Sequence, residues 1–435
     1  MKYLMNALKY CVVVPLCFSS FSSIALSAEG FFDGAEGELE LRNYYLNKDF
    51  KDNGRSRVDP GPNNRGMAEE WTQSFILDAQ SGFTPGVVGF GVDVLGTFAV
   101  KLDGGRGTYG TQLLPTHDGN DPADNFGRLG LAVKTRMGQT VLKVGEWSPI
   151  LPILRSNDSR ALPQSFEGAM LTSQDFKDLT LYAGQFNRNS QRNDASMEKL
   201  SLMNAGKVVH NGNTIESDHF NFGGAEYMFN NRQTMAGVWY AQLEDIYHQQ
   251  YFQLRHTQPL AIDLTFNMNL GLFLGDEDGQ ALAGEQRNQT ASGLFSLAKG
   301  PHRFSVGLQK VSGPAQFQRI SGTSGGTLAN DTFAWAYDGI DERSWQVRYD
   351  FDFAAVGIPG LGAMARLVKG TDVDFGAIDN GEDRGAEAEL SYVVQSGNFK
   401  KLNVRLRSYS LRRDYGSTNS YNENRVMISY PISLF

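Results

Sequence analysis

The sequence predicts an all-β fold: a transmembrane antiparallel β-barrel of about 18 strands, with short periplasmic turns, long extracellular loops and one loop folded into the pore. Three observations lead to this prediction. The chain begins with an export signal. Its remainder contains no uncharged apolar run near the ~20 residues that a membrane helix needs. Apolar and polar residues alternate in segments of about ten, which is the pattern of a barrel strand.

The export signal divides the chain into two parts. Lys2 and Lys9 flank a polar start, residues 10–24 are mostly apolar, and small residues at 25–28 supply a cleavage site. We therefore expect residues 1–28 to be a signal peptide and residues 29–435 to be the barrel channel. Both cysteines lie in the first part, so we expect a mature chain without disulfides.

Net charge narrows the range of partners. Without Lys2 and Lys9 the 40 basic residues become 38, against 48 acidic residues, which gives a formal net charge of −10. This balance excludes nucleic acid as an expected partner. Small solutes, membrane lipid and lipopolysaccharide remain, and an apolar outer belt is compatible with either a homotrimer or a monomer.

Residues 345–353 show the alternation most clearly. Val347 and Phe351 share one face of the expected strand, whereas Arg348 and Asp350 share the other. The same pattern recurs at residues 39–45, 129–136 and 403–409. In a barrel with a polar lumen, the apolar face contacts lipid.

Short turns give the strand number. Eight turns rich in Gly, Pro, Asn or charged residues separate alternating segments, at residues 81–86, 137–139, 175–178, 230–231, 258–259, 299–301, 357–360 and 396–398. Eight hairpins and one strand at each end make about 18 strands. Longer polar connections, such as residues 51–69, 104–125, 188–218, 276–288 and 314–341, lie between the hairpins. The chain ends in Phe435, and an aromatic end is common in outer-membrane barrels.

The sequence gives little indication of catalysis. The six histidines show no metal-ligand spacing, and no nucleophile or phosphate-binding motif is present. We therefore expect no cofactor, no metal and no enzymatic activity, with a barrel-embedded hydrolase as the alternative.

Basic residues recur on the face that should line the lumen. Arg405 and Arg407 are two residues apart on one strand, so they would form successive rungs about 6.6 Å apart. An arginine fork binds a carboxylate through two parallel hydrogen bonds, and several weak sites in series suit conduction. The alternative is that these arginines pair with inward acids such as Glu40, Asp350 and Asp352.

The connection at residues 148–168 has an unusual composition for a loop. It carries three prolines and the apolar residues Ile150, Leu151, Ile153 and Leu154. Folded inward, its apolar part would be buried and residues 157–160 would line a constriction. The alternative is an outer loop packed on its neighbours.

The chain resembles the OprD-type (Occ) family of substrate-specific porins. The matching stretches are residues 41–49, 81–94, 142–146, 157–168, 243–247, 344–361 and 391–407. The resemblance implies an 18-stranded barrel in the bacterial outer membrane, with a third extracellular loop that forms an eyelet inside the pore.

The resemblance also implies the site residues and the solutes. A basic ladder that guides substrate carboxylates falls on Arg42, Lys143, Arg348, Arg366, Arg405 and Arg407. Asp158, Ser159 and Arg160 fall on the inserted loop, and Asp338 in the seventh loop is expected to help form an opposing acidic pocket. The implied function is passive uptake of small carboxylate-containing solutes: aromatic or other carboxylic acids, or amino acids. A channel for basic amino acids or peptides, and a general-diffusion porin, remain alternatives.

Overall fold

The computed structural model describes residues 30–51, 66–117, 121–202, 209–210, 213–323, 326–416 and 420–435. The predicted signal peptide, residues 1–28, lies outside the described residues. Among the helices of the described residues, none is long and apolar enough to cross a membrane.

Antiparallel strands form the wall of a closed barrel. The main sheet contains 20 strands, and two short ones, β10 and β13, extend it at one rim, so 18 strands make the wall. These are β1 (Glu36–Phe50), β2 (Met67–Gln80), β3 (Val88–Asp103), β6 (Asn125–Met137), β7 (Thr140–Trp147), β8 (Ser165–Ser173), β9 (Leu179–Ser190), β14 (Phe220–Phe229), β15 (Thr234–Leu243), β16 (Tyr247–Ala261), β17 (Leu264–Glu277), β18 (Asn288–Lys299), β19 (His302–Ser312), β20 (Arg343–Asp352), β21 (Leu361–Phe375), β22 (Ile378–Val393), β23 (Asn403–Arg413) and β24 (Tyr421–Ser433).

The remaining elements are short. They are β4 (Thr116–His117), β5 (Asp121–Pro122), β10 (Glu198–Ser201), β11 (Val209–His210), β12 (Asn213–Thr214), β13 (Glu216–Ser217) and the 3-10 helix η1 (Phe353–Val356). Four connections matter for the site: loop 2 (residues 104–124), loop 3 (148–164), loop 4 (191–219) and loop 7 (313–342).

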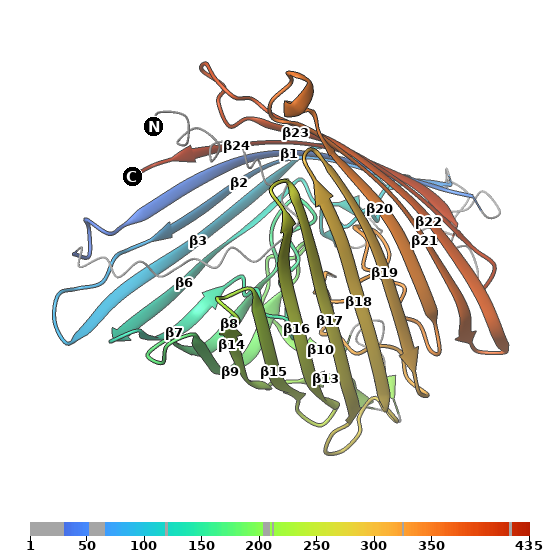
Figure 1. Ribbon diagram of the computed structural model, residues 1–435, viewed down its shortest axis with the longest axis horizontal. Coiled ribbons are helices and arrows are strands. Elements are labelled where there is room, and N and C mark those ends of the chain that lie inside the picture. Colours follow the sequence, from blue (N-terminus) through green and yellow to red (C-terminus); the bar gives the residue numbers. More distant parts are fainter. Residues whose placement is uncertain are drawn as a thin grey trace.

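The first and last strands close the barrel. β24 pairs with β1 from Glu38↔Ser433 to Phe50↔Tyr421, and Figure 1 shows the red strand beside the blue one. The register runs through Pro431 without a shift, so Pro431 causes no bulge. The strand ends at Ser433, and the side chain of Phe435 is exposed beyond it.

The turns confirm the predicted strand count. Seven of the eight predicted turns lie between consecutive wall strands. The turn predicted at residues 258–259 was wrong, because β16 continues to Ala261 and the chain reverses at residues 262–263. Pro259 lies in the strand next to a register shift at the end of the ladder, where a missing N–H is tolerated.

The wall has its apolar face outside and its polar face inside. On β20, Trp345 and Val347 are 45% and 43% exposed, whereas Gln346 between them is 1% exposed. The register extends this division across neighbouring strands, since Val306, Val347 and Leu367 pair along the outer face. This arrangement is the reverse of a soluble sandwich and is the one expected for a wall surrounded by lipid.

Candidate functional site

Loop 3 lies inside the barrel, bound to the lumenal face of β1. The Arg42 guanidinium donates to both oxygens of the Asp158 carboxylate, at 2.5 and 3.1 Å, and to the carbonyl of Arg160 at 3.2 Å. The Tyr44 hydroxyl donates to the carbonyl of Ser159 at 2.9 Å. Arg42 and Tyr44 are consecutive inward residues of β1, so the predicted insertion of this loop into the pore is confirmed.

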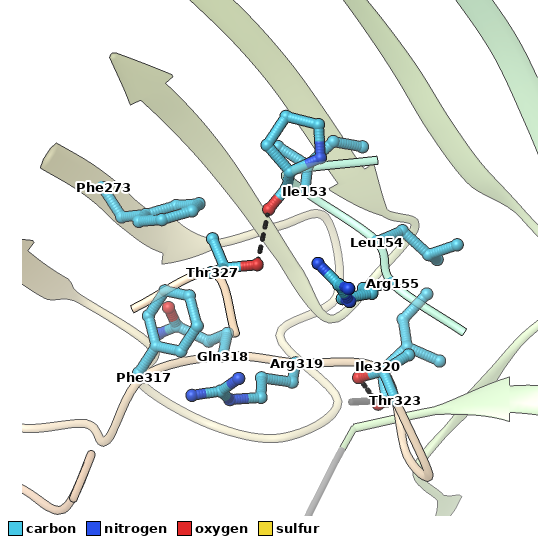
Figure 2. Close-up of a pocket in the computed structure, with 11 residues that line it drawn as sticks. Ile153, Leu154, Arg155, Phe273, Phe317, Gln318, Arg319, Ile320, Thr323 and Thr327 are labelled. Atoms are coloured by element: carbon cyan, nitrogen blue, oxygen red, sulfur yellow. Dashed lines mark hydrogen bonds between the residues drawn. The ribbon is translucent and has the colours of Figure 1, made fainter. Parts of the chain in front are cut away.

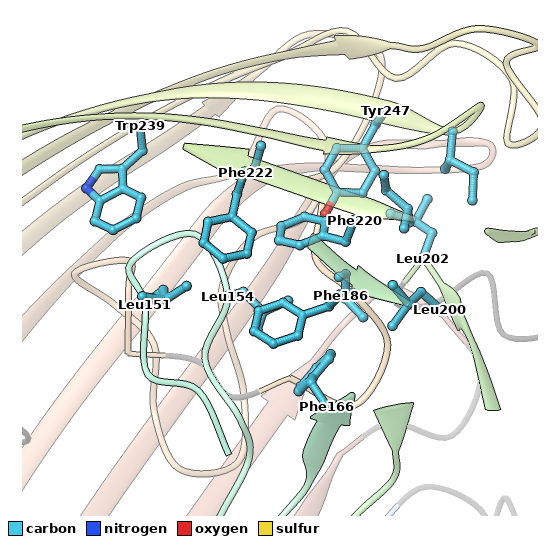
Figure 3. Close-up of a cluster of buried hydrophobic side chains, with 14 of the residues drawn as sticks. Leu151, Leu154, Phe166, Phe186, Leu200, Leu202, Phe220, Phe222, Trp239 and Tyr247 are labelled. Atoms are coloured by element: carbon cyan, nitrogen blue, oxygen red, sulfur yellow. The ribbon is translucent and has the colours of Figure 1, made fainter. Parts of the chain in front are cut away.

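The apolar half of loop 3 is held by aromatic side chains inside the barrel. Leu151 and Leu154 are buried in a cluster that contains Phe186, Phe222 and Trp239 (Figure 3). Ile153 packs against the same cluster, but Ile150 is 57% exposed and departs from the expected burial. Burial of this segment removes apolar area from water and fixes the loop tip in the lumen.

Two arginines at this constriction have no carboxylate partner among the described residues. Arg160 donates to the carbonyls of Thr111 and Ser159, at 2.9 and 2.8 Å. Arg192, from loop 4, donates to the hydroxyl of Ser159 at 3.0 Å and to the amide oxygen of Gln112. Carbonyl and hydroxyl oxygens satisfy the hydrogen bonds but do not cancel the charge.

The surrounding charges make this region electropositive. Burial and then the charge of Arg425 lower the pKa of Arg160, and burial together with Arg160 lowers the pKa of Arg192 well below its usual value. The nearby ionisable side chains comprise five cations against four carboxylates: Arg42, Lys48, Arg160, Arg192 and Arg425 against Glu40, Glu70, Asp158 and Glu423. An anion held here would relieve this repulsion.

All six residues of the predicted ladder face the lumen, and each lies in an ion pair. Arg42 pairs with Glu40 and Asp158, Lys143 with Asp93 at 2.6 Å, Arg348 with Asp350 at 2.6 Å, Arg366 with Glu387, Arg405 with Glu389 at 3.4 Å, and Arg407 with Glu389. Pairing with inward acids, the alternative considered from the sequence, therefore occurs at Glu40 and Asp350. Asp352 instead accepts the backbone N–H of Ala354 at 2.9 Å.

Pairing does not remove the ladder's capacity to bind. A guanidinium has five N–H donors, and one carboxylate uses at most two or three of them. The register places Arg348 opposite Arg366 and Arg407 opposite Arg425, so the arginines form two cross-strand pairs, with Glu387 and Glu389 of β22 between them. These pairs offer weak, repeated contacts to a passing anion.

Loop 7 is a second loop inside the barrel; the resemblance implied a role at the pore for its Asp338, but the residue pattern alone did not predict its insertion. Lumenal side chains bind its backbone carbonyls: Arg425 donates to Phe333 at 2.9 Å, Arg366 to Asp331 at 2.9 Å, and Gln309 to Tyr337 at 2.6 Å. Loop 7 thus covers the wall from β19 to β24, and its Phe317 packs against Phe273 of β17 in the aromatic cluster.

Asp338 lies on loop 7 and not at the tip of loop 3. Its carboxylate is 2.9 Å from the Arg319 guanidinium, which also binds Asp331 at 2.8 Å. Burial lowers the pKa of Arg319, but the two carboxylates outweigh burial and raise it. Arg319 faces two carboxylates, so this cluster keeps one excess negative charge, and the acidic pocket that the resemblance implies at Asp338 stays a prediction.

Arg192 is the constriction residue that sequence reasoning missed. It lies in loop 4, where no strand periodicity indicates which way a side chain points. The described residues also contain no group of three or more His, Cys, Asp or Glu placed to hold a metal ion.

Comparison with known proteins places these features in a family. Residues 29–434 match the family described as outer membrane porin, OprD family. The porin-like protein GalP of Pseudomonas putida is 53% identical over 98% of both chains.

Solved structures agree in fold. A BenF-like porin from Pseudomonas fluorescens Pf-5 is 52% identical over 93% of this chain and 100% of that one, with a TM-score of 0.88. OccK2 (OpdF) of Pseudomonas aeruginosa, crystallised with glucuronate, is 48% identical over 94% and 100%, with a TM-score of 0.83. OpdK of the same species, crystallised with vanillate, is 44% identical over 93% and 100%, with a TM-score of 0.85.

Proposed function

Because this chain belongs to the OprD family of outer membrane porins, we propose that it mediates passive uptake of small carboxylate-containing solutes across the bacterial outer membrane. The family and the fold are those of channels, not of enzymes. The observation that carries the proposal is the pair Arg160 and Arg192, which lies at the constriction without a described carboxylate partner.

The solute class follows from the geometry of these groups. A guanidinium fork matches the two oxygens of a carboxylate, and a site with excess positive charge repels cationic solutes. The relatives crystallised with glucuronate and vanillate both held a small acid. We include aromatic and other carboxylic acids and amino acids in the class, with the six ladder residues as the path beyond the constriction.

Other parts of the proposal concern the assembly. The apolar outer face is suited to membrane lipid and lipopolysaccharide, and either a monomer or a homotrimer accommodates it. Residues 1–28 remain a predicted signal peptide. Catalysis has no role in this function.

Uptake into proteoliposomes tests the proposal. The probes are benzoate, glucuronate and glutamate, with arginine and a neutral sugar of similar size for comparison. We expect the three acids to enter faster than the sugar, and the variant Arg160→Gln/Arg192→Gln to slow the acids roughly tenfold while sugar uptake changes little. Arg287→Gln, an exposed loop arginine 2.8 Å from Glu285, is the control.

The same assay separates the alternatives. Arginine entering faster than the acids would identify a channel for basic amino acids, and equal rates for all five probes would identify a general-diffusion porin. In bilayer recordings, Arg405→Gln/Arg407→Gln should strongly change the small single-channel conductance if the ladder conducts. A large conductance insensitive to this change would exclude a role for the ladder.

A further inference from the structure

Below loop 7 the lumen contains a cavity of about 260 Å³, here called the lateral cavity. Its upper wall is loop 7, and its sides are inward residues of β18 to β23 together with Arg155 of loop 3. Gly362 and Ser391 line it close to the periplasmic ends of β21 and β22. The cavity therefore lies on the periplasmic side of the constriction.

The residues that line the lateral cavity carry one more positive than negative charge. Four guanidinium groups line it, those of Arg155, Arg348, Arg366 and Arg407, against the three carboxylates of Asp331, Glu387 and Glu389. Arg348 pairs with Asp350, Arg366 with Glu387, and Arg407 with Glu389, whereas Asp331 shares Arg319 with Asp338, which does not line the cavity. Arg155 makes no ion pair or side-chain hydrogen bond to any residue that the structure describes.

Contacts between loop 3 and loop 7 hold Arg155 in place. The Thr327 hydroxyl donates to the carbonyl of Pro152 at 3.0 Å, and the Arg155 guanidinium packs beside Gly326, where a Cβ would lie 3.8 Å from Nη1. Figure 2 shows Arg155 between Thr327 and Ile320 with its nitrogens directed into the space between the loops. The group is thus positioned while its five donors remain available.

We propose that Arg155 forms a second carboxylate-binding site, separate from the constriction, which takes a small acid with a flat apolar body. The large apolar side chains of the cavity wall are Leu294, Leu328, Phe333 and Met364. The volume corresponds to about nine waters at ~30 Å³ each, which is enough for one six-membered ring and its carboxylate. This inference rests on the proposed function, because it assumes that acids reach the lumen.

The second site gives the channel two anion sites in series. An acid leaving Arg160 and Arg192 toward the periplasm meets Arg155 next, and the paired ladder residues Arg348 and Arg407 line the same cavity. Conduction requires sites that bind weakly and in succession, so that entry is favourable and exit remains fast.

Single-channel recording with benzoate on the periplasmic side tests this site, because benzoate reaches Arg155 from there without crossing the constriction. Benzamide is the uncharged probe of the same shape. We expect benzoate to block the wild-type channel for longer than benzamide, and Arg155→Gln to shorten the benzoate blocks roughly tenfold. Arg155→Lys, which keeps the charge but loses the fork, should give intermediate blocks. The exposed-loop control Arg287→Gln should leave the blocks unchanged.

The outcomes distinguish this inference from the proposed function. Benzoate blocks of wild-type length in Arg155→Gln would overturn the second site and leave the proposed function intact. Equal blocks by benzoate and benzamide in the wild type would contradict both. Circular dichroism of each variant in detergent establishes that the barrel is folded, and Arg155→Lys provides the test if Arg155→Gln does not fold.

Discussion

The two sides of the lumen are built from different chemistry. From β9 through β14 to β17, inward positions carry aromatic rings, among them Phe186, Phe222, Trp239 and Phe273. From β20 to β24 and on to β1, inward positions carry arginines paired with acids. The aromatic side acts as a hydrophobic core that holds loop 3, and the charged side is left to contact solutes.

Removing the arginine of the most buried ion pair on the charged side should cause the largest loss of stability. Arg425 is 1% exposed and binds Glu423, the carbonyl of Phe333 and the hydroxyl of Tyr44. Arg425→Leu leaves Glu423 buried with Lys48 as its remaining ion-pair partner, so we expect a loss of about 3 to 5 kcal/mol in the free energy of unfolding. Urea unfolding in detergent measures the loss.

The double variant Arg425→Leu/Glu423→Gln is the matched control. Removing both charges should recover part of the lost stability, because no buried carboxylate is left without its partner. If Arg425→Leu is as stable as the wild type, the ion pair of Arg425 and Glu423 contributes charge to the lumen but no stability to the barrel.

Removing a buried ring from the aromatic side should reduce stability less than removing Arg425, but it should also change conduction. Phe186 is fully buried and stacks on Phe222 at a centroid distance of 5.4 Å. Phe186→Ala should lower the free energy of unfolding by about 3 kcal/mol. Loop 3 then loses part of its support, so we expect a higher single-channel conductance with more frequent fluctuations. Unchanged conductance would show that loop 3 is held by Arg42 and Tyr44 alone.

Adding a methyl group to the aromatic side tests how tightly that side is packed. A Cβ at Gly224 would lie 2.3 Å from the ring of Trp239, so this position accommodates the indole only because it is glycine. Gly224→Ala should destabilise the barrel by about 1 to 3 kcal/mol. Gly223→Ala, where the nearest atom would be at 3.7 Å, is the control and should be close to neutral in the same thermal melts.

The smallest expected effect concerns pH on the charged side. Burial, and then the neighbouring carboxylate of Asp383, raise the pKa of Glu342 at the end of loop 7 well above its usual value. The folded pKa exceeds the unfolded one, so the attachment of loop 7 is fully stable below about pH 4.3 and weakens as pH rises toward the folded pKa. For one proton, the free energy that holds loop 7 in place changes by at most about 1.4 kcal/mol per pH unit.

Current noise from loop 7 reports this weakening. Noise should increase in the wild type as pH rises above about 4.3 and stay flat in Glu342→Gln, which cannot ionise. Glu285→Gln, an exposed loop acid that pairs with Arg287, should behave as the wild type does. If the current noise of the wild type does not change with pH, then backbone hydrogen bonds alone hold loop 7 in position.

The strands of the barrel wall could be predicted from the sequence, whereas most contacts inside the barrel could not. Alternation and turn residues predicted the strand number and the inward face of Arg348 and Arg407, because both are local properties of a strand. The turn at residues 258–259 was misplaced by a few residues, since Pro259 can end a ladder without ending the strand.

The interior depends on contacts distant in sequence. Trp239 and Tyr251 face inward although they are aromatic, because they belong to a buried cluster to which loop 3 and loop 7 contribute apolar residues that alternation cannot reveal. Arg155 and Arg192 lie on loops, where no periodicity assigns a direction. The acid partners of the ladder follow partly from spacing, as with Arg348 and Asp350, and partly from strand register, as with Arg366 and Glu387.

Closure of the barrel by β1 and β24 determines how the chain must fold. The hydrogen bond between Arg425 and Tyr44 joins residues 381 positions apart, and the first strand has no second neighbour until the last strand arrives. Contacts at such sequence separation form slowly, and an unpaired edge invites aggregation. The barrel therefore cannot be completed from the N-terminus as the chain is delivered, and a chain shortened by its last strand would keep two open edges.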